Sequence, residues 1–433
     1  TLGQDTINFS ILNSDAGYTG TDGVDAHWQI SLTAALPTIT ESVILDGTSQ
    51  TSFGGDTNPG TLGVVTEVGV NDTAIAGVER PEIEIIGDST LDNGLLISAD
   101  NVTVTGFAMY GFSKGGAAAI EITDAVINTS VTGNIFGSGA TGISDPGLAL
   151  NNTSGVIADG ADNGNIAGNI FAFSKSKGIQ ALNAADGWSI TGNQFIDIGL
   201  NASNGDAIGI NASSGITIDG NYLSGTSTQA LYTGSGTNNI TFSNNTVVNN
   251  GVGPTSGTHI QYDAIALRSG SYDITIAHNI IANNYGAGIT VNDGAAGVLI
   301  TENSVYGNGT VLSRQGTAAT GIVGIDLQNA TDDRSFGTAP YYTANDAGDA
   351  DTGGNSLQNF PVITQAVSDG TQIAISGTFN STANETFTIE LFTSASYANG
   401  YGQGETFLGS VSVTTDGSGN ATFNTTLFTE VES

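Results

Sequence analysis

Seven asparagines recur at regular intervals between positions 134 and 303, each just before a short segment with apolar side chains. Successive intervals are 35, 24, 28, 24, 34 and 24 residues. A period near 24 residues, lengthened in places by loop insertions, is typical of a solenoid whose coils stack on one another. The repeated residues are Asn134, Asn169, Asn193, Asn221, Asn245, Asn279 and Asn303. We expect them to form one column, in which each amide donates to one neighbouring coil and accepts from the other.

Two further kinds of short apolar segment accompany this column in the repeats. One has the pattern small-apolar-x-apolar, as in Ala207-Ile-Gly-Ile, and the other resembles Asp273-Ile-Thr-Ile. Their alternation places Ile, Leu, Val and Phe inside and Thr, Ser and Asp outside. Together with the segment after the asparagine, they predict three parallel, in-register strands per coil with right-handed connections. The expected fold class is therefore all-β.

Composition limits the possible partners. The chain has 433 residues, with 41 acidic against seven basic side chains and a net charge of −34, which disfavours nucleic acid and anionic membranes as partners. No run of about 18 apolar residues predicts membrane insertion, and cysteine is absent. We expect an extracellular or bacterial cell-surface protein from a salty or calcium-containing setting, cut from a longer chain. Acidity that serves solubility alone is an equal alternative.

Two segments resemble a known family. Pro37-Thr-Ile-Thr-Glu-Ser-Val-Ile-Leu-Asp-Gly resembles the first coils of bacterial right-handed parallel β-helix repeat proteins of the pectate-lyase-like superfold. Asn345-Asp-Ala-Gly-Asp-Ala-Asp-Thr-Gly-Gly-Asn resembles the closing segment of large exported members, often those with an upstream Cys-Ser-Leu-Arg-Glu-Ala motif, which is absent here. The resemblance implies a right-handed parallel β-helix. It leaves the function open, because the superfold includes lyases, hydrolases, epimerases, adhesins and structural rods.

The pattern changes along the chain and predicts its organisation. After Pro361, five strand-like segments have the spacing of a sandwich, fewer than the roughly seven of an immunoglobulin-like domain. Residues 48–79 are loop-like and are expected to extend off the body. We predict four regions: a lead-in or cap at 1–27, a right-handed parallel β-helix at 28–340, an Asp/Gly-rich junction at 341–360 and a truncated Ig-like β-sandwich at 361–433.

One coil carries the mixed charges that catalysis would need. A lyase uses a base and commonly Ca²⁺ held by carboxylates, and here Arg268 is the candidate base with His259 and Asp263 beside it. A simple ion pair between Arg268 and Asp263 is the favoured interpretation. A second pair, His278 and Glu302, lies one period apart and is either an acid–base dyad or, more simply, an exposed ion pair.

Non-catalytic ligands have candidates as well. Neutral glycans could bind through Tyr262, Tyr232, Asn211 and Asn292 on the outer face of the coils. Oxygen ligands alternate with glycine turns in the junction, as calcium loops do, although no glutamate follows at the twelfth position. The candidate Ca²⁺ ligands are Asn345, Asp346, Asp349, Asp351 and Asn355, against the alternative of a solvated hinge.

The favoured function is a non-enzymatic rod with a structural, adhesive or surface-assembly role, whose partners are glycans, other copies of itself or other surface proteins. An open sandwich edge could accept a strand from a neighbouring copy, with Thr6-Ile-Asn-Phe-Ser-Ile as a conceivable donor. The alternative is a polysaccharide lyase or epimerase. A phage tail-spike, the third hypothesis, would be a trimer and is disfavoured by the appended sandwich.

Overall fold

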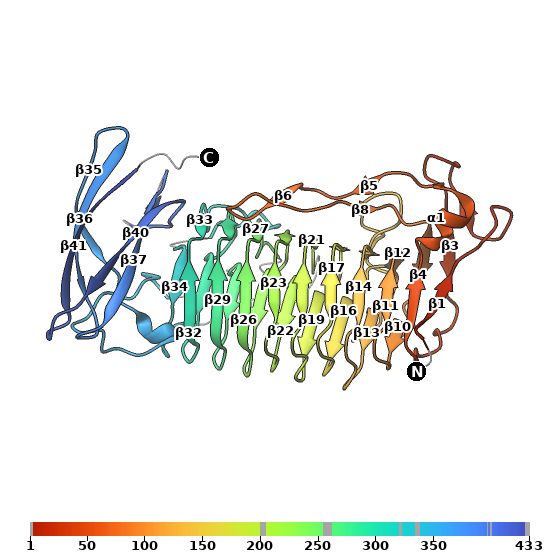
Figure 1. Ribbon diagram of the computed structural model, residues 1–433, viewed down its shortest axis with the longest axis horizontal. Helices are drawn as coiled ribbons and strands as arrows, with labels where there is room; N and C mark the ends of the chain where they lie inside the picture. Colours follow the sequence, from red (N-terminus) through yellow and green to blue (C-terminus); the bar gives the residue numbers. More distant parts are fainter. Residues whose placement is uncertain are drawn as a thin grey trace.

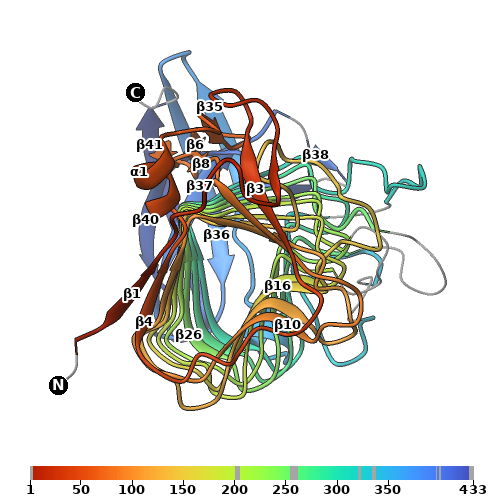
Figure 2. The same cartoon turned by 90° about the vertical axis from the view of Figure 1, so that its right-hand side faces the viewer.

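Three long parallel sheets, here called A, B and C, wrap around one continuous core (Figures 1 and 2). In each coil the chain passes through a strand of sheet A, then of sheet B, then of sheet C. The computed structural model describes residues 3–199, 205–253, 262–319, 323–333, 338–395, 397, 398 and 401–428. The fold is a right-handed parallel β-helix, as the sequence predicted. Among the described residues the helices are α1 (Ser49–Gly54) and a 3-10 turn, η1 (Gly354–Leu357), and neither could cross a membrane.

Each sheet takes one strand from nearly every coil. Sheet A consists of β1 (Asp5–Asn8), β4 (Val43–Asp46), β11 (Thr103–Thr105), β14 (Ser130–Thr132), β17 (Asn165–Ala167), β20 (Ser189–Thr191), β23 (Thr217–Asp219), β26 (Asn238–Ser243), β29 (Tyr272–Ala277) and β32 (Ala296–Thr301). Sheet B consists of β2 (Tyr18–Thr19), β3 (His27–Ser31), β9 (Ile83–Ile86), β12 (Phe107–Tyr110), β15 (Ile135–Phe136), β18 (Ile170–Ala172), β21 (Gln194–Ile196), β24 (Tyr222–Ser224), β27 (Thr246–Val248), β30 (Ile280–Ala282) and β33 (Ser304–Tyr306). Sheet C consists of β10 (Asn93–Ile97), β13 (Ala118–Ile122), β16 (Ser154–Asp159), β19 (Lys177–Leu182), β22 (Ile208–Ile210), β25 (Leu231–Thr233), β28 (Ile265–Leu267), β31 (Ile289–Val291) and β34 (Ile325–Leu327).

In-register stacking builds the core from like residues. Phe136, Phe171 and Phe195 are register partners in sheet B, and their rings stack with centroids 4.9 Å apart at both steps. Such offset aromatic pairs add about 0.5–1.5 kcal/mol each beyond the burial of their area. A one-residue slip would turn every apolar side chain outward, so the alternating pattern fixes the register.

The seven recurrent asparagines lie in one buried column at the turn into sheet B. Asn169 donates from its backbone N–H and from Nδ2 to Oδ1 of Asn193, both at 3.0 Å. Nδ2 of Asn193 in turn donates to the carbonyl of Ile166, at 2.8 Å. The same links join the column from Asn134 to Asn303, so each amide satisfies backbone groups of a neighbouring coil.

A second asparagine column lies five residues further along each coil, after the sheet B strand. It contains Asn250, Asn284 and Asn308, which are joined through Oδ1 as in the first column. The side chain of Gln403, which follows β39, takes the next place. Its Oε1 accepts from Asn308 N at 3.0 Å, and its Nε2 donates to Asn308 O at 2.9 Å.

The amino-terminal segment is part of the rod. β1 pairs in parallel with β4, so the proposed donor strand that begins at Thr6 is paired within its own chain. His27 and Glu84 are both buried in the first coils, with Nε2 and Oε1 3.3 Å apart. Burial lowers the pKa of His27, but the contacts with Glu84 and with the carbonyl of Asp25 together outweigh it, so the net pKa is raised.

A two-stranded ribbon runs along the rod over sheet B (Figure 1). This strap pairs β5 (Thr61–Leu62) with β8 (Val78–Glu79) and β6 (Glu67–Val68) with β7 (Thr73–Ala74). Val64 N donates to Oε1 of Gln194 at 2.7 Å, and Gly69 N donates to Oγ1 of Thr246 at 2.9 Å. The prediction that residues 48–79 extend off the body is therefore wrong. The strap covers an outward apolar cluster on sheet B that includes Ile135 and Ile170.

The carboxy-terminal region folds into two small antiparallel sheets with their own core. One sheet has the order β35 (Val362–Ser368), β36 (Gln372–Asn380), β41 (Asn420–Phe428), and the other pairs β37 (Thr386–Thr393) with β40 (Thr406–Thr414). A short pair, β38 (Tyr397–Ala398) and β39 (Tyr401–Gly402), precedes β40. The core between the sheets consists of Ile375, Phe379, Ile389, Leu391, Val413 and Phe423. An immunoglobulin-like topology for this sandwich remains a prediction.

The sandwich closes the end of the β-helix. Glu390 on β37 accepts from the backbone N–H of Glu302 at 3.0 Å and from the hydroxyl of Thr301. Val305 N donates to the carbonyl of Gly404 at 2.8 Å, which continues the edge of β33. Backbone groups that the last coil would otherwise leave unpaired thus find partners in the sandwich.

Candidate functional site

The outer face of sheet C carries a row of side chains that lie in register. Gly209 pairs with Tyr232, Tyr232 with Ala266, Ala266 with Thr290, and Thr290 with Asp326. The two smallest residues of the row stand on either side of Tyr232 and leave room around its ring. A Cβ at Gly209 would lie 2.9 Å from Cδ of Lys177, so the lysine side chain would have to move to admit a side chain there.

The ring of Tyr232 lies between two cations. Nζ of Lys177 is 5.9 Å from the ring centroid, and Cζ of Arg268 is 5.7 Å from it. Such contacts stabilise by about 0.5–2 kcal/mol, more where water is excluded. Lys177 also forms a buried salt bridge with Asp206, which accepts a further hydrogen bond from Thr228 Oγ1. Both cations are therefore already held by protein groups.

A chain of hydrogen bonds crosses three successive coils beside this ring. Nη1 of Arg268 donates to Oδ1 of Asn292 at 2.8 Å, and Nδ2 of Asn292 donates to Oε1 of Gln328. Nε2 of Gln328 then donates to Oδ2 of Asp326 at 2.9 Å. Asn292 and Gln328 are nearly inaccessible to solvent, so the network is rigid and pre-ordered.

These groups line a cavity of about 560 Å³ on the outer face of the rod. Its lining residues are Tyr232, Ser235, Arg268, Ser269, Asn292, Asp293, Gln328, Asn329, Ala330 and Asp332. Amides, hydroxyls and one aromatic ring make up most of the wall, and Arg268, Asp293 and Asp332 add charged groups. Groups of these kinds bind the hydroxyls and the apolar faces of a sugar.

Two buried carboxyls belong to this part of the molecule: Asp326, which ends the network, and Asp263, whose charge acts on it. Burial raises the pKa of Asp263 to about 6, although the hydroxyl of Thr290 and the charge of Arg268 oppose the shift. Burial also raises the pKa of Asp326 to about 7, with Gln328 opposing and the negative charge of Asp263 adding to the shift. Paired carboxyls with raised pKa values are typical of acid–base sites but also occur in structural networks.

The cavity brings together three of the predicted site residues, Tyr232, Asn292 and Arg268. Asn211 lies two coils before Arg268, with its Oδ1 where a Cβ of Gly234 would stand. Tyr262 is only 9 % exposed and does not line the cavity. His259 lies outside the described residues.

Sequence reasoning overlooked Lys177 as a member of this site, and it named Gln328 only among the positions that flank the outward row. Gln328 was visible as the flank of the last small-apolar strand, but only as a position without a partner. Lys177 is the first residue of its strand. Gly209 on the next coil lies against the lysine side chain, and a glycine at this outward position was the only sign in the sequence that a long side chain passes there. A lysine two coils away from an aromatic residue has no recognisable spacing in the sequence.

The predicted pair His278 and Glu302 lies on the corner before sheet B. Nε2 and Oε2 are 2.8 Å apart, and the two side chains are 38 % and 45 % exposed. Both residues line a second cavity, separate from the one on sheet C. An exposed ion pair of this kind contributes about 1 kcal/mol or less to stability.

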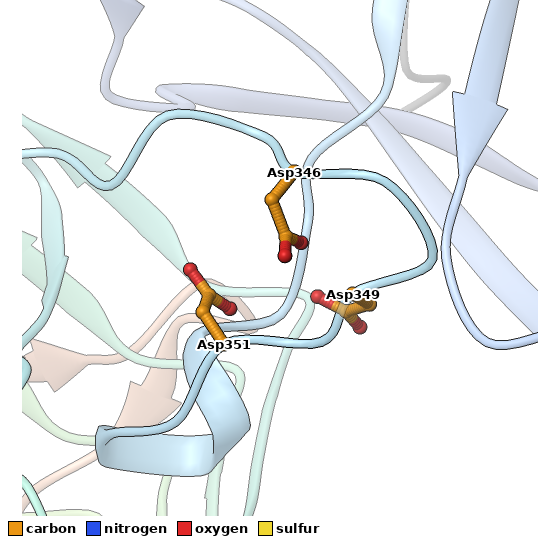
Figure 3. Close-up of side chains that lie close together, drawn as sticks. All are labelled: Asp346, Asp349 and Asp351. Atoms are coloured by element: carbon orange, nitrogen blue, oxygen red, sulfur yellow. The ribbon is translucent and has the colours of Figure 1, made fainter.

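Three junction carboxylates converge, as Figure 3 shows. One ligand oxygen each from Asp346, Asp349 and Asp351 lies within 4.8 Å of the others. Burial and then the charges of Asp346 and Asp349 raise the pKa of Asp351. Oδ1 of Asp351 is inaccessible and has no hydrogen-bond partner among the described residues. A cation that prefers oxygen ligands would reduce the repulsion among the three carboxylates and would give Oδ1 of Asp351 a partner.

The two asparagines predicted to join this cluster are used elsewhere. Asn345 pairs through its side-chain amide with the backbone of Phe360, at 2.7 and 2.9 Å. Asn355 pairs in the same way with Val298 on β32, at 3.0 and 3.1 Å. A side-chain amide can donate to the carbonyl and accept from the N–H of one residue, as a neighbouring strand does. Both asparagine amides are used in this way and therefore do not face the carboxylates.

Residues 154–333 match the family model described as "Right handed beta helix region". The chain contains a right-handed β-helix region. No curated protein matched the sequence. Among solved structures, the Dettilon tailspike protein is 12 % identical with a TM-score of 0.46, over 93 % of this chain and 87 % of that one.

Two epimerases are also similar in structure. A periplasmic alginate epimerase double mutant is 16 % identical with a TM-score of 0.38, over 54 % of this chain and 61 % of that one. A mannuronan C-5 epimerase A-module from Azotobacter vinelandii is 12 % identical with a TM-score of 0.34, over 71 % and 89 %. At such identities and scores the likeness carries no information about a ligand or a reaction.

Proposed function

We propose that this chain is a non-enzymatic, extracellular β-solenoid that binds a neutral glycan in the cavity on sheet C. The observation that carries the proposal is the pre-ordered wall of this cavity, where Tyr232 stands beside the Arg268–Asn292–Gln328 network. The guanidinium of Arg268 is held by Asn292 and lies over Tyr232, which disfavours its use as a base. Uncharged amides and hydroxyls match sugar hydroxyls without requiring a charged ligand.

Titration of the full chain with neutral oligosaccharides, selected on a glycan array, tests this proposal. Tyr232→Ala should weaken binding at least about tenfold, because it removes the aromatic wall and frees both cations. Tyr272→Ala is the matched control, since Tyr272 is 46 % exposed on sheet A, away from the cavity. Equal losses in both variants, or no binding at millimolar concentrations, would refute it.

A polysaccharide lyase or epimerase is the second candidate. It is favoured by the raised pKa values of Asp326, which ends the same network, and of Asp263, whose charge acts on it. A lyase acting on a uronate polymer with calcium would produce an unsaturated product and a rise in ultraviolet absorbance. Arg268→Ala should abolish that rise. If absorbance does not rise with pectate, alginate or glycosaminoglycans, the lyase function is excluded for these substrates and glycan binding remains the proposal.

Calcium and surface assembly complete the proposal. The three junction carboxylates and the unsatisfied Oδ1 of Asp351 support a Ca²⁺ site, whose role would be to fix the connection between rod and sandwich. The acidic composition supports a location outside the cell, and it disfavours nucleic acid as a partner. Other copies of the chain or other surface proteins remain proposed partners, with the uncharged edge strand β35 as the accessible element.

A further inference from the structure

A second cavity, of about 400 Å³, lies where three distant parts of the chain meet. One wall is the tip of the strap at Gly69–Asp72, and another is the beginning of β40, at Glu405–Phe407. The third wall consists of solenoid residues from two successive coils, among them His278 and Glu302. Cavities between separately folded elements are common ligand sites.

Hydrogen bonds hold the strap tip at this cavity. Val70 N donates to the carbonyl of His278 at 3.1 Å. Nδ2 of Asn71 donates to Oδ1 of Asn244 at 3.0 Å. On the sandwich side, Oγ of Ser304 donates to the carbonyl of Glu405 at 2.5 Å. The walls are therefore fixed before any ligand arrives, which lowers the entropic cost of binding.

The lining combines negative charge with apolar surface. Its carboxyls belong to Asp72, Glu302 and Glu405, and none of its described lining residues is Lys or Arg. Val70 and Phe407 supply apolar surface beside them. The net charge of −34 adds a long-range attraction for cations. His278 also lines the cavity and pairs with Glu302 at 2.8 Å, so the lining keeps an excess of carboxyls over basic groups.

The corner that carries His278 and Glu302 has a left-handed backbone in every coil of the first column. The residue before each asparagine of the first column has a left-handed conformation, and glycine fills this position in four earlier coils. In the coils that line the cavity the same position holds His278, with φ of 58°, and Glu302, with φ of 51°. A non-glycine residue is strained in this conformation, whereas glycine is not.

We propose that this cavity binds an organic cation, an amine or guanidinium group that carries an adjoining apolar or sugar surface. The carboxylates of Glu302 and Glu405 accept hydrogen bonds from the cationic group, while Phe407 and Val70 contact its carbon skeleton. This site is separate from the glycan cavity on sheet C and does not depend on it. An amino sugar and a basic amino-acid side chain share the required chemistry.

Titration calorimetry of the full chain at physiological salt tests the proposal with four probes. Glucosamine and N-acetylglucosamine differ in the charge of one nitrogen, and agmatine and arginine amide present a guanidinium. Binding of glucosamine alone would identify an amino sugar, and binding of the guanidinium probes would identify a basic side chain. Both results support the proposal, and binding of none of the cationic probes overturns it.

Substitutions then locate the site. Glu302→Gly should fold normally, since glycine occupies the same corner elsewhere, and should weaken binding of the active probe at least about tenfold. Glu405→Gln removes the charge with little change of shape and should also weaken binding of the active probe. Asp273→Gly is the matched control, because Asp273 also has a left-handed backbone, with φ of 54°, and is exposed outside the cavity lining.

The control separates a site from general attraction to an acidic protein. Asp273→Gly should leave the affinity within twofold of the wild type. An equal loss in Asp273→Gly and Glu302→Gly, or equal binding of glucosamine and its N-acetyl form, would overturn the proposal.

Discussion

A buried asparagine in the first column satisfies backbone groups of its own coil and of the coil before it. Oδ1 of Asn221 accepts from N and Nδ2 of Asn193, and its own Nδ2 donates to the carbonyls of Ile190 and Asp219. Asn221→Ala should therefore lower the free energy of unfolding by about 2–4 kcal/mol, because buried backbone groups lose their partners. Chemical denaturation measures the loss.

The control for this substitution is Asn239→Gly. Asn239 is exposed and has a left-handed backbone, with φ of 53°, which glycine adopts without strain. We expect a change of less than about 0.5 kcal/mol. A loss at Asn221 no larger than this would mean that the column contributes nothing to stacking.

The raised pKa of Asp326 makes a prediction about pH. Because the folded pKa of about 7 lies above the ordinary value of 3.8, ionisation opposes folding. The cost is absent below pH 4, grows between pH 4 and pH 7, and is complete above pH 7. Asp326→Asn keeps an oxygen for Gln328 and should raise the melting temperature by about 2–5 °C at pH 8, with little change at pH 4. A rise of equal size at both pH values would contradict this cause.

Single residues were predictable where their interval was regular. The first asparagine column follows from its spacing, since Asn recurs in seven coils. The second column was not recognised, because Thr226 stands in the place of its asparagine one coil before Asn250, and the interval is visible over only three coils. The burial of Tyr262 could not be predicted either, because Tyr262 lies in an interval of 34 residues between two column asparagines, where no repeat position indicates its environment.

At the level of elements, the strap gives the clearest test. It covers the outward side chains of Ala108, Ile135 and Ile170, which would otherwise face water. Replacing residues 61–79 with a short Gly-Ser linker should lower the melting temperature by several degrees and increase binding of a hydrophobic dye, since apolar area becomes exposed. Deleting only the β6–β7 tip should leave the dye signal unchanged. A full deletion without dye binding would mean that the strap does not protect the cluster.

The strands of the coils were predictable from alternation with period two, and the strap was not. Its strands are two residues long, and the hydrogen bonds of Val64 and Gly69 beside them reach partners on the rod 130 and 177 positions away in the sequence. The alternation of apolar and polar residues within a short segment does not predict contacts between segments so far apart. The predicted metal site shows a related limit, since Asn345 and Asn355 have suitable chemistry but bind the backbones of Phe360 and Val298.

For the whole molecule, the connection between rod and sandwich decides whether the end of the solenoid is protected. Gln403 extends the second asparagine column, and Glu390 binds the last coil beside the first column. The junction that carries Asp346, Asp349 and Asp351 also contacts the sandwich, because Oδ2 of Asp349 accepts from Ser381 Oγ at 2.7 Å. An ion held by these carboxylates would therefore stabilise both regions at once.

Calcium should accordingly raise the melting temperature of the full chain, and a chelator should reverse the rise. At ten to a hundred times its dissociation constant a bound ion contributes about 1.4–2.7 kcal/mol, because it binds only the folded state. Asp351→Asn should remove most of this gain, since it deletes one of three charges around the ion, whereas Asp273→Asn on exposed β29 should keep it. Sodium chloride at equal ionic strength separates binding from charge screening. If salt alone reproduces the rise, or Asp351→Asn keeps it, the three carboxylates repel one another across a solvated hinge and hold no ion.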